Sequence, residues 1–263
     1  MNGADSTGRI RLKWLGCACF EMRFGDLTVV NDPWITPNER NGLTWEAVEA
    51  CDLITLTHSH YDHTLDIPAL ARKFSPYVLC GEQSAPALMR FADLNPMDVY
   101  PLSPGLELDF GAVRIRAVYG RHTPLPGTMN ERIRKAETSP VNRGDPNLIE
   151  MAVWGDIEYR NYLFILPDGR KMLLWGNRLD RPDQKATVKS LKPDILLLQM
   201  TGKVTAEQIA EVCRAGGIRT VIPHHIDFPG DYRPLAVIIS RELKSRCPEI
   251  NFIFPEYGEW LEV

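Results

Sequence analysis

The chain of 263 residues contains no apolar run that approaches the roughly 18 residues needed to span a bilayer, so no membrane span is expected. Segment 1–8 is polar and lacks the apolar core of a signal peptide, which predicts a cytoplasmic protein. The chain also lacks an excess of positive charge, because its formal net charge is −4, and we expect no nucleic-acid partner. The remaining class is a globular domain, for which a hydrophobic content of 44% is ordinary.

The six cysteines are scattered along the chain, and several lie inside strand-like runs. In a chain without a secretion signal, reduced and buried thiols are expected. Cys17 and Cys19 are close enough in sequence to suggest binding of a soft metal. No second cysteine pair completes a tetrahedral site, so we do not expect one there.

The densest chemistry lies in the run Thr57–Thr64, which reads THSHYDHT. It follows the short apolar and β-branched run 51–57, which predicts a buried strand. It precedes 65–74, which predicts a helix with Thr64 as its N-cap. Three imidazoles and a carboxylate are therefore expected in one loop at the carboxyl end of a strand, where open α/β layers usually place their ligand sites.

The spacing within this loop indicates metal binding. His58 and His60 are two residues apart in an extended segment, so their side chains can point the same way and share one ion. Asp62 and His63 follow after a turn and can reach a second ion nearby. Imidazole nitrogen and carboxylate oxygen suit Zn, which we expect first, and also Mn or Fe. The alternative is a chance histidine cluster on a solvated loop.

The segments before the loop predict a β meander. Segment 9–15 alternates basic and apolar residues, and 19–24 and 27–30 form two strands around a Gly25-Asp26 turn. Asp32 closes the meander and precedes a proline. Its carboxylate either orients the histidines of the loop or only forms the turn, and both interpretations stay open.

The segments after the loop alternate between strands and helices. A strand at 113–118 leads into His122, and the proline- and glycine-containing stretch 124–150 is predicted to cover the site, with one short helix at 130–137. The other predicted strands are 77–80, 106–109, 159–166, 171–175, 194–199, 220–222 and 251–254, and the other predicted helices are 83–91, 183–191, 205–215 and 235–244.

The pattern HxHxDH at the end of an apolar strand resembles the signature of the metallo-β-lactamase superfamily. The run WLGCACFEMRFGDLTVVNDPW is similar to the opening of the branch that contains L-ascorbate-6-phosphate lactonases and related phosphodiesterases. In that branch a histidine often follows the glycine, whereas Cys17 occupies the position here. The resemblance spans Trp14 to about Asp227 and implies an α+β fold, a four-layer αββα sandwich. We predict one such domain over 1–263, with a lid or insertion at 124–150.

The resemblance also implies a ligand set. His122 stands where the third motif of the family is expected, and Pro223-His224-His225 matches the final motif, Pro-any-His, which assigns His225 as a ligand. His224 would then face away, towards substrate or solvent, although the reverse assignment stays open. The implied set is His58, His60 and His122 on one metal, with Asp62, His63 and His225 on the other.

The family pattern has Gly-Asp, whose carboxylate bridges both metals, where this chain has Gly176-Asn177. Asn177 is kept as a candidate metal ligand, but its side-chain oxygen is neutral, so two divalent ions against the single carboxylate of Asp62 leave a net charge of +3. Three outcomes follow. The second metal is weak or absent, the excess charge favours an anionic substrate such as a phosphate ester, or catalysis is lost and a binding pocket remains.

We therefore predict a metal-dependent hydrolase in which one or two divalent ions activate water against a small, anionic ester such as a phosphodiester or lactone. Asp62, Asn177 and His224 are assigned catalytic roles. Tyr61, Arg121 and Arg178 flank the ligands and are candidates for substrate binding. The alternative is a non-catalytic or regulatory metal- or ligand-binding protein on the same fold. An oxygen-reducing di-iron site would have the pattern HxExDH, so His60 argues against a redox role.

Overall fold

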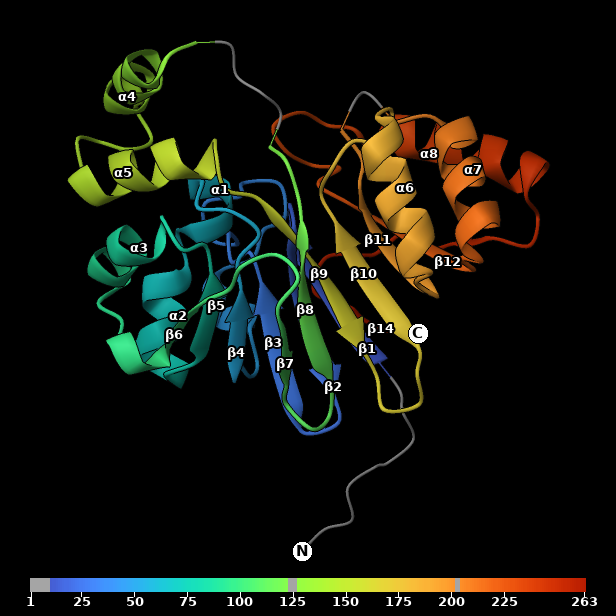
Figure 1. The fold of residues 1–263 in the computed structure, drawn as a ribbon, viewed down its shortest axis with the longest axis horizontal. Coiled ribbons are helices and arrows are strands. Elements are labelled where there is room, and N and C mark those ends of the chain that lie inside the picture. Colours follow the sequence, from blue (N-terminus) through green and yellow to red (C-terminus); the bar gives the residue numbers. More distant parts are fainter. Residues whose placement is uncertain (1–9, 123–126, 202–203) are drawn as a thin grey trace, which may run out of the picture.

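The computed structural model describes residues 10–122, 127–201 and 204–263. Segment 1–8, the first residue of the strand predicted at 9–15 and residues 124–126 of the predicted insertion lie outside this part. Two seven-stranded sheets pack face to face, and helices cover the outer side of each (Figure 1). The predicted α+β sandwich of four layers is confirmed. None of the helices in the described ranges is long and apolar enough to cross a membrane.

The first sheet has the strand order β14-β1-β2-β3-β4-β5-β6. Phe24 pairs with Leu27 across the predicted Gly25-Asp26 turn. The short strands at both edges were not predicted, because three residues show too little alternation to be recognised. The bounds are β1 (Ile10–Gly16), β2 (Cys19–Phe24), β3 (Leu27–Asn31), β4 (Leu53–Thr55), β5 (Tyr77–Cys80), β6 (Val99–Pro101) and β14 (Trp260–Glu262).

The second sheet has the strand order β13-β12-β11-β10-β9-β8-β7. Its centre is the predicted hairpin, in which Lys171 pairs with Ile165. The bounds are β7 (Glu107–Asp109), β8 (Arg114–Tyr119), β9 (Arg160–Ile165), β10 (Lys171–Trp175), β11 (Ile195–Gln199), β12 (Thr220–His224) and β13 (Asn251–Phe252).

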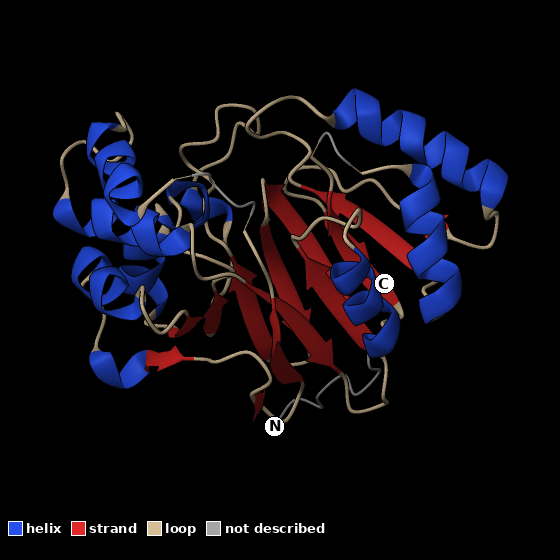
Figure 2. Cartoon of the chain, turned by 45° about the horizontal axis from the view of Figure 1, so that its top comes forward, coloured by secondary structure: helices blue, strands red, loops and turns tan. Residues whose placement is uncertain are grey.

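The helices flank the two sheets on opposite sides (Figure 2). Helices α1 to α5 lie beside the first sheet, and α6 to α8 lie beside the second (Figure 1). The bounds are α1 (Tyr61–Thr64), α2 (Ile67–Phe74), α3 (Ala85–Ala92), α4 (Met129–Thr138), α5 (Pro146–Gly155), α6 (Pro182–Leu191), α7 (Ala206–Gly216) and α8 (Arg233–Arg246), with short 3-10 turns at Trp45–Ala47 and Pro96–Asp98.

Apolar burial holds the layers together. Phe24 of the first sheet stacks on Phe164 of the second, with ring centroids 5.4 Å apart. Trp14 and Trp175 are fully buried in the same core. A separate core on the other face of the first sheet joins it to the helices and includes Met151 of α5. Each such side chain contributes roughly 1.5–3 kcal/mol when fully buried, so the strand ends that carry polar groups rest on a rigid base.

Two local predictions were wrong. Thr64 is not the N-cap of the following helix, because it is the last residue of α1, and Asp66 precedes α2 instead. Helix α5 was missed, because its apolar residues are not confined to one stripe. Its start is nevertheless marked in the sequence, since the Asp145 side chain accepts from two amides of the first turn and a proline follows it.

Candidate active site

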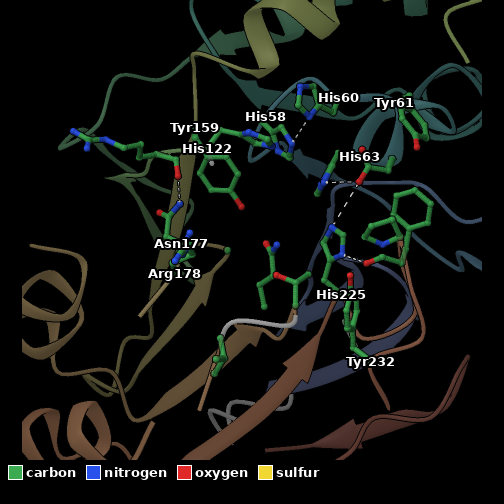
Figure 3. A pocket seen from close by; sticks show the side chains of 18 residues that line it. His58, His60, Tyr61, His63, His122, Tyr159, Asn177, Arg178, His225 and Tyr232 are labelled. Atoms are coloured by element: carbon green, nitrogen blue, oxygen red, sulfur yellow. Dashed lines mark hydrogen bonds and ion pairs between the residues drawn. The ribbon is translucent and has the colours of Figure 1, made fainter. Parts of the chain in front are cut away.

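Polar residues from both sheets meet at one edge of the sandwich, just after the carboxyl ends of six strands. This edge contains a cavity of about 550 Å³ (Figure 3). Six residues at this edge each come shortly after a strand in the sequence: Cys17 after β1, Asp32 after β3, His58 after β4, His122 after β8, Asn177 after β10 and His225 after β12. The fold therefore brings residues that are far apart in the sequence together at one site.

The first donor cluster consists of His58, His60 and His122, whose ligand atoms all lie within 4.8 Å of one another. His58 Nε2 and His60 Nδ1 are 3.1 Å apart. The other ring nitrogen of His60, Nε2, lies 3.2 Å from Asp156 Oδ1 at the end of α5. A proton on Nε2 satisfies that carboxylate and leaves the Nδ1 lone pair directed at the cluster, as in histidines that bind metals.

The second donor cluster consists of Cys17, Asp62, His63 and His225, again with all ligand atoms within 4.8 Å. Asp62 Oδ2 lies 3.4 Å from His63 Nε2 and 3.7 Å from His225 Nε2. The far nitrogens of both rings are anchored, because His63 Nδ1 lies 2.9 Å from Asp32 Oδ2 and His225 Nδ1 lies 2.5 Å from the Phe228 carbonyl. When each ring is neutral and carries its proton on Nδ1, its Nε2 lone pair points into the cluster.

The charges of the second cluster perturb its pKa values. Burial by itself would lower the pKa of His63, but Asp62 and Asp32 outweigh burial and raise it to about 10. Burial likewise opposes ionisation of Asp62, yet His63 and His225 hold the pKa of this carboxyl well below its usual range. Two carboxylates thus create a site in which positive charge is strongly favoured.

His58 in the first cluster has the opposite preference. Burial, followed by the neighbouring His63, His60 and His122, holds the pKa of His58 well below that of a free imidazole. A neutral imidazole keeps a lone pair available for coordination. Convergent, oriented nitrogen and carboxylate donors fit divalent cations, and the donor set on its own does not distinguish Zn from Mn or Fe.

The backbone is strained at this edge. Cys17, Asp32 and His225 have φ values of 48°, 43° and 58°, in the left-handed region that residues with a Cβ rarely adopt. Such conformations cost of order 1–3 kcal/mol each and persist only where surrounding contacts enforce them. Of the other residues of this kind in the described ranges, Ser75, Asp93 and Lys192 end helices and Arg143 lies in the turn between α4 and α5.

Of the two interpretations of Asp32, the structure supports the one in which its carboxylate orients the loop. Asp32 Oδ1 accepts from the Thr57 amide at 2.7 Å, and Oδ2 accepts from the Thr57 hydroxyl at 2.7 Å. Together with the contact to His63, these bonds fix the start and the middle of the metal loop. The carboxylate is fully buried, so the contacts are shielded from water.

Asn177 lines the cavity, and both ends of its amide are engaged. Its Nδ2 donates to the Arg121 carbonyl at 2.8 Å, and its Oδ1 accepts from Asn161 Nδ2 at 2.7 Å. Asn161 Oδ1 in turn accepts from the Gly176 amide at 2.9 Å, so the orientation of both amides is determined. The neighbours of residue 177 thus match both the donor and the acceptor of an amide. The bond to the Arg121 carbonyl fixes the backbone just before His122.

The prediction that His224 faces substrate or solvent was wrong. Only 1% of His224 is exposed, and its ring packs edge-on against Phe20 between the sheets. Burial lowers its pKa to about 3, so it stays neutral. β12 ends at His224, whose side chain enters the core, and the left-handed backbone at His225 turns the next side chain towards the cluster. It therefore leaves the catalytic set.

The wall of the cavity includes the three predicted flanking residues, Tyr61, Arg121 and Arg178. It also includes Tyr159, whose ring centroid lies 4.8 Å from that of His58 and which no motif had marked. Asp156 was missed for the same reason. Cys17 did have a signal, because it stands where the lactonase branch often has a histidine.

The profile of the beta-lactamase superfamily domain matches residues 11–225 of this chain. A UPF0173 metal-dependent hydrolase of Cupriavidus necator is 27% identical over 210 residues, which cover 77% of this chain and 68% of the relative. Among solved structures, the metallo hydrolase Igni18 of Ignicoccus hospitalis has a TM-score of 0.71 at 17% identity and covers 97% of this chain and 98% of that one.

A diiron β-hydroxylase of Streptomyces venezuelae, CmlA, has a TM-score of 0.62 at 14% identity, over 97% of this chain and 54% of that one. At these identities the likeness concerns the fold alone. The fold is thus shared by a metallo hydrolase and a diiron β-hydroxylase.

Proposed function

This chain belongs to the β-lactamase superfamily, and on that premise we propose that it is a metal-dependent hydrolase that holds its ions in the two facing donor clusters. The observation that carries the proposal is the anchoring of three histidines by their far nitrogens, His60 by Asp156, His63 by Asp32 and His225 by a carbonyl. Relatives named as metal-dependent hydrolases support the same reaction class.

The proposed ligands are His58, His60 and His122 on one side, with Asp62, His63 and His225 on the other. Divalent ions held by these residues would lower the pKa of bound water and would stabilise negative charge that develops on a substrate oxygen. Asp62 is ionised and lines the cavity, so its carboxylate can accept a hydrogen bond from water and orient it. Asn177 acts by positioning the chain before His122.

The proposed substrate is a small anionic ester, such as a phosphodiester or a lactone that carries a phosphate. Arg121 and Arg178 are among the lining residues, with the Arg178 guanidinium ion-paired to Asp180, and Tyr61 and Tyr159 supply aromatic walls. The net positive charge of two divalent ions and their ligands would favour an anionic substrate. A cavity of about 550 Å³ lies within the usual range for sites that bind small molecules. Assignment to the lactonase branch rests on the opening motif of the sequence and is part of this proposal.

We further propose one domain, in which the insertion at 124–150 walls the site on the side of the first cluster. Helix α5 packs on α3, and the Ser59 hydroxyl donates to the Met151 carbonyl at 2.7 Å. Gly155 approaches His60 so closely that an added Cβ would lie 2.5 Å from His60 Cδ2. The contacts of Met151 and Gly155 come from the part of α5 that follows residue 150, so they tie the helix that ends the insertion to the metal loop.

The test combines metal analysis with a substrate panel. We expect the purified protein, dialysed against Zn or Mn, to retain metal and to hydrolyse at least one chromogenic phosphodiester or lactone. Removal of metal by a chelator should abolish turnover, and His58→Ala should do the same. Full metal occupancy without turnover of any substrate would instead favour the non-catalytic binding protein, which the amide of Asn177 in place of a bridging carboxylate makes the second candidate.

A further inference from the structure

The geometry points to Cys17 as a thiolate ligand of the second metal cluster, where it supplies the negative charge that Asn177 does not. This inference rests on the proposed function and assigns a residue that the motif pattern left out. It replaces the expectation that the Cys17 and Cys19 pair has no metal role, because the two cysteines turn out to lie in different surroundings.

The donor atoms place Cys17 in the cluster. Its Sγ lies within 4.8 Å of the ligand atoms of Asp62, His63 and His225, and these four residues are all buried. Zn–S bonds of about 2.3 Å and Zn–N bonds of about 2.0–2.1 Å separate the donors of a tetrahedral site by roughly 3.5 Å, so small side-chain adjustments close the site. Cys19 belongs to the large apolar core between the first sheet and its helices, whereas the buried apolar partners of Cys17 are only Ala18 and Trp34 among the described residues.

Hydrogen bonds from distant residues hold the backbone of Cys17 in its left-handed conformation. Its amide donates to both carboxylate oxygens of Asp227, at 3.0 and 3.1 Å, and its carbonyl accepts from the His225 amide at 2.8 Å. Trp14 Nε1 donates to the same carbonyl at 3.0 Å. Residues that are 210 positions apart thus clamp a cysteine of positive φ beside His225, itself of positive φ. The strain is accounted for if both side chains must reach one ion.

A Cys17 thiolate would offset part of the excess positive charge of the two ions. With Asp62 as the only anion, two divalent ions leave a net charge of +3, and a Cys17 thiolate reduces it to +2. The missing bridging carboxylate is thereby compensated from another strand, and the second ion no longer depends on residue 177. A thiolate also makes the second cluster softer than the first, which favours Zn and Co over Mn.

Cobalt substitution tests the assignment by spectroscopy. The metal-free protein is titrated with Co²⁺, and the near-ultraviolet thiolate-to-cobalt charge-transfer band is recorded for wild type, Cys17→Ser and the matched control Cys19→Ser. We expect the band in wild type and Cys19→Ser and its loss in Cys17→Ser, which should keep one cobalt ion on the three histidines. Chelator competition should show at least a 10-fold weaker second ion in Cys17→Ser, since even partners that only orient ligands are worth about 10–100-fold.

X-ray absorption on the Zn-loaded wild type repeats the test without a variant, so a folding defect in Cys17→Ser cannot hide the answer. A sulfur scatterer at about 2.3 Å is expected. Two bound ions with neither a sulfur scatterer nor a charge-transfer band would overturn the role of Cys17 and leave the proposed function standing. A band that survives in Cys17→Ser would also overturn it. A wild type that binds no metal at all would refute the proposed function itself.

Discussion

The substitution Asn177→Asp restores the carboxylate of the family pattern, yet we expect it to destabilise the metal-free protein. Asn177 is 4% exposed, and its Nδ2 donates to the Arg121 carbonyl at 2.8 Å. An aspartate places a carboxylate oxygen against that carbonyl, so a donor is lost and two oxygens face each other. The bond that Oδ1 accepts from Asn161 can survive the change.

The magnitude follows from the lost donor. Leaving one buried acceptor without its partner costs about 1–3 kcal/mol. For a chain of this size that corresponds to a fall in Tm of about 2–12 °C. The deficit should grow as the pH rises through the titration of the new carboxyl, because only the protonated acid can donate to the Arg121 carbonyl.

The assay is thermal unfolding with chelator and then with excess Zn, and Asn142→Asp is the matched control. Asn142 is also buried, and its Nδ2 donates to the Ala136 carbonyl at 2.7 Å, outside the donor clusters. If the new carboxylate at 177 reaches the ions, Zn should remove part of its deficit and none of the control's. A metal-free Asn177→Asp protein as stable as wild type would refute the reasoning, because the amide network would then orient nothing.

Three further results are expected. Asp156→Asn should weaken metal binding at the three-histidine cluster by about 10–100-fold in chelator competition, whereas Glu150→Gln on the same helix should leave it unchanged. Burial lowers the pKa of His224 to about 3, so the stability linked to its neutral ring is complete above pH 6.5 and is lost as the pH falls towards 3. His224→Phe should therefore flatten the dependence of the unfolding free energy on pH between 6.5 and 3. An unchanged pH dependence would contradict the burial of His224 as a neutral ring. The Lys13 contact lowers the pKa of Glu49 to about 2, so its contribution is present above pH 4.5 and lost as the pH falls to 2; wild type and Glu49→Gln should therefore unfold alike at pH 2.

Much of the fold could be predicted because its signals are local. The buried β-branched runs, the Gly25-Asp26 turn and the capping box of Thr205 and Gln208 all lie within a few residues, and all are present in the structure. Helix α5 and the edge strands were missed, because a helix without a single apolar stripe and a strand of three residues have weak periodicity. Their existence depends on the neighbours against which they pack.

The candidate site could likewise be predicted only in part. The spacing of His58, His60, Asp62 and His63 marks a metal loop without any knowledge of the rest of the chain. The direction of each ring does not follow from spacing, because it is set by distant acceptors such as Asp156, which follows the last turn of α5. Sequence left the roles of His224 and His225 open, and the strand geometry decided that His224 is a core residue.

The sequence by itself determined the superfamily, the layered fold and the imidazole-rich loop, since short-range periodicity and residue spacing carry that information. Only the tertiary structure decided which charges meet there. It placed Cys17 beside Asp62, and it bound the amide of Asn177 between Asn161 and the Arg121 carbonyl. The reason is physical: charge and coordination act over a few ångströms in space, and the strands that bring these groups within reach are joined by sheet pairing across most of the chain.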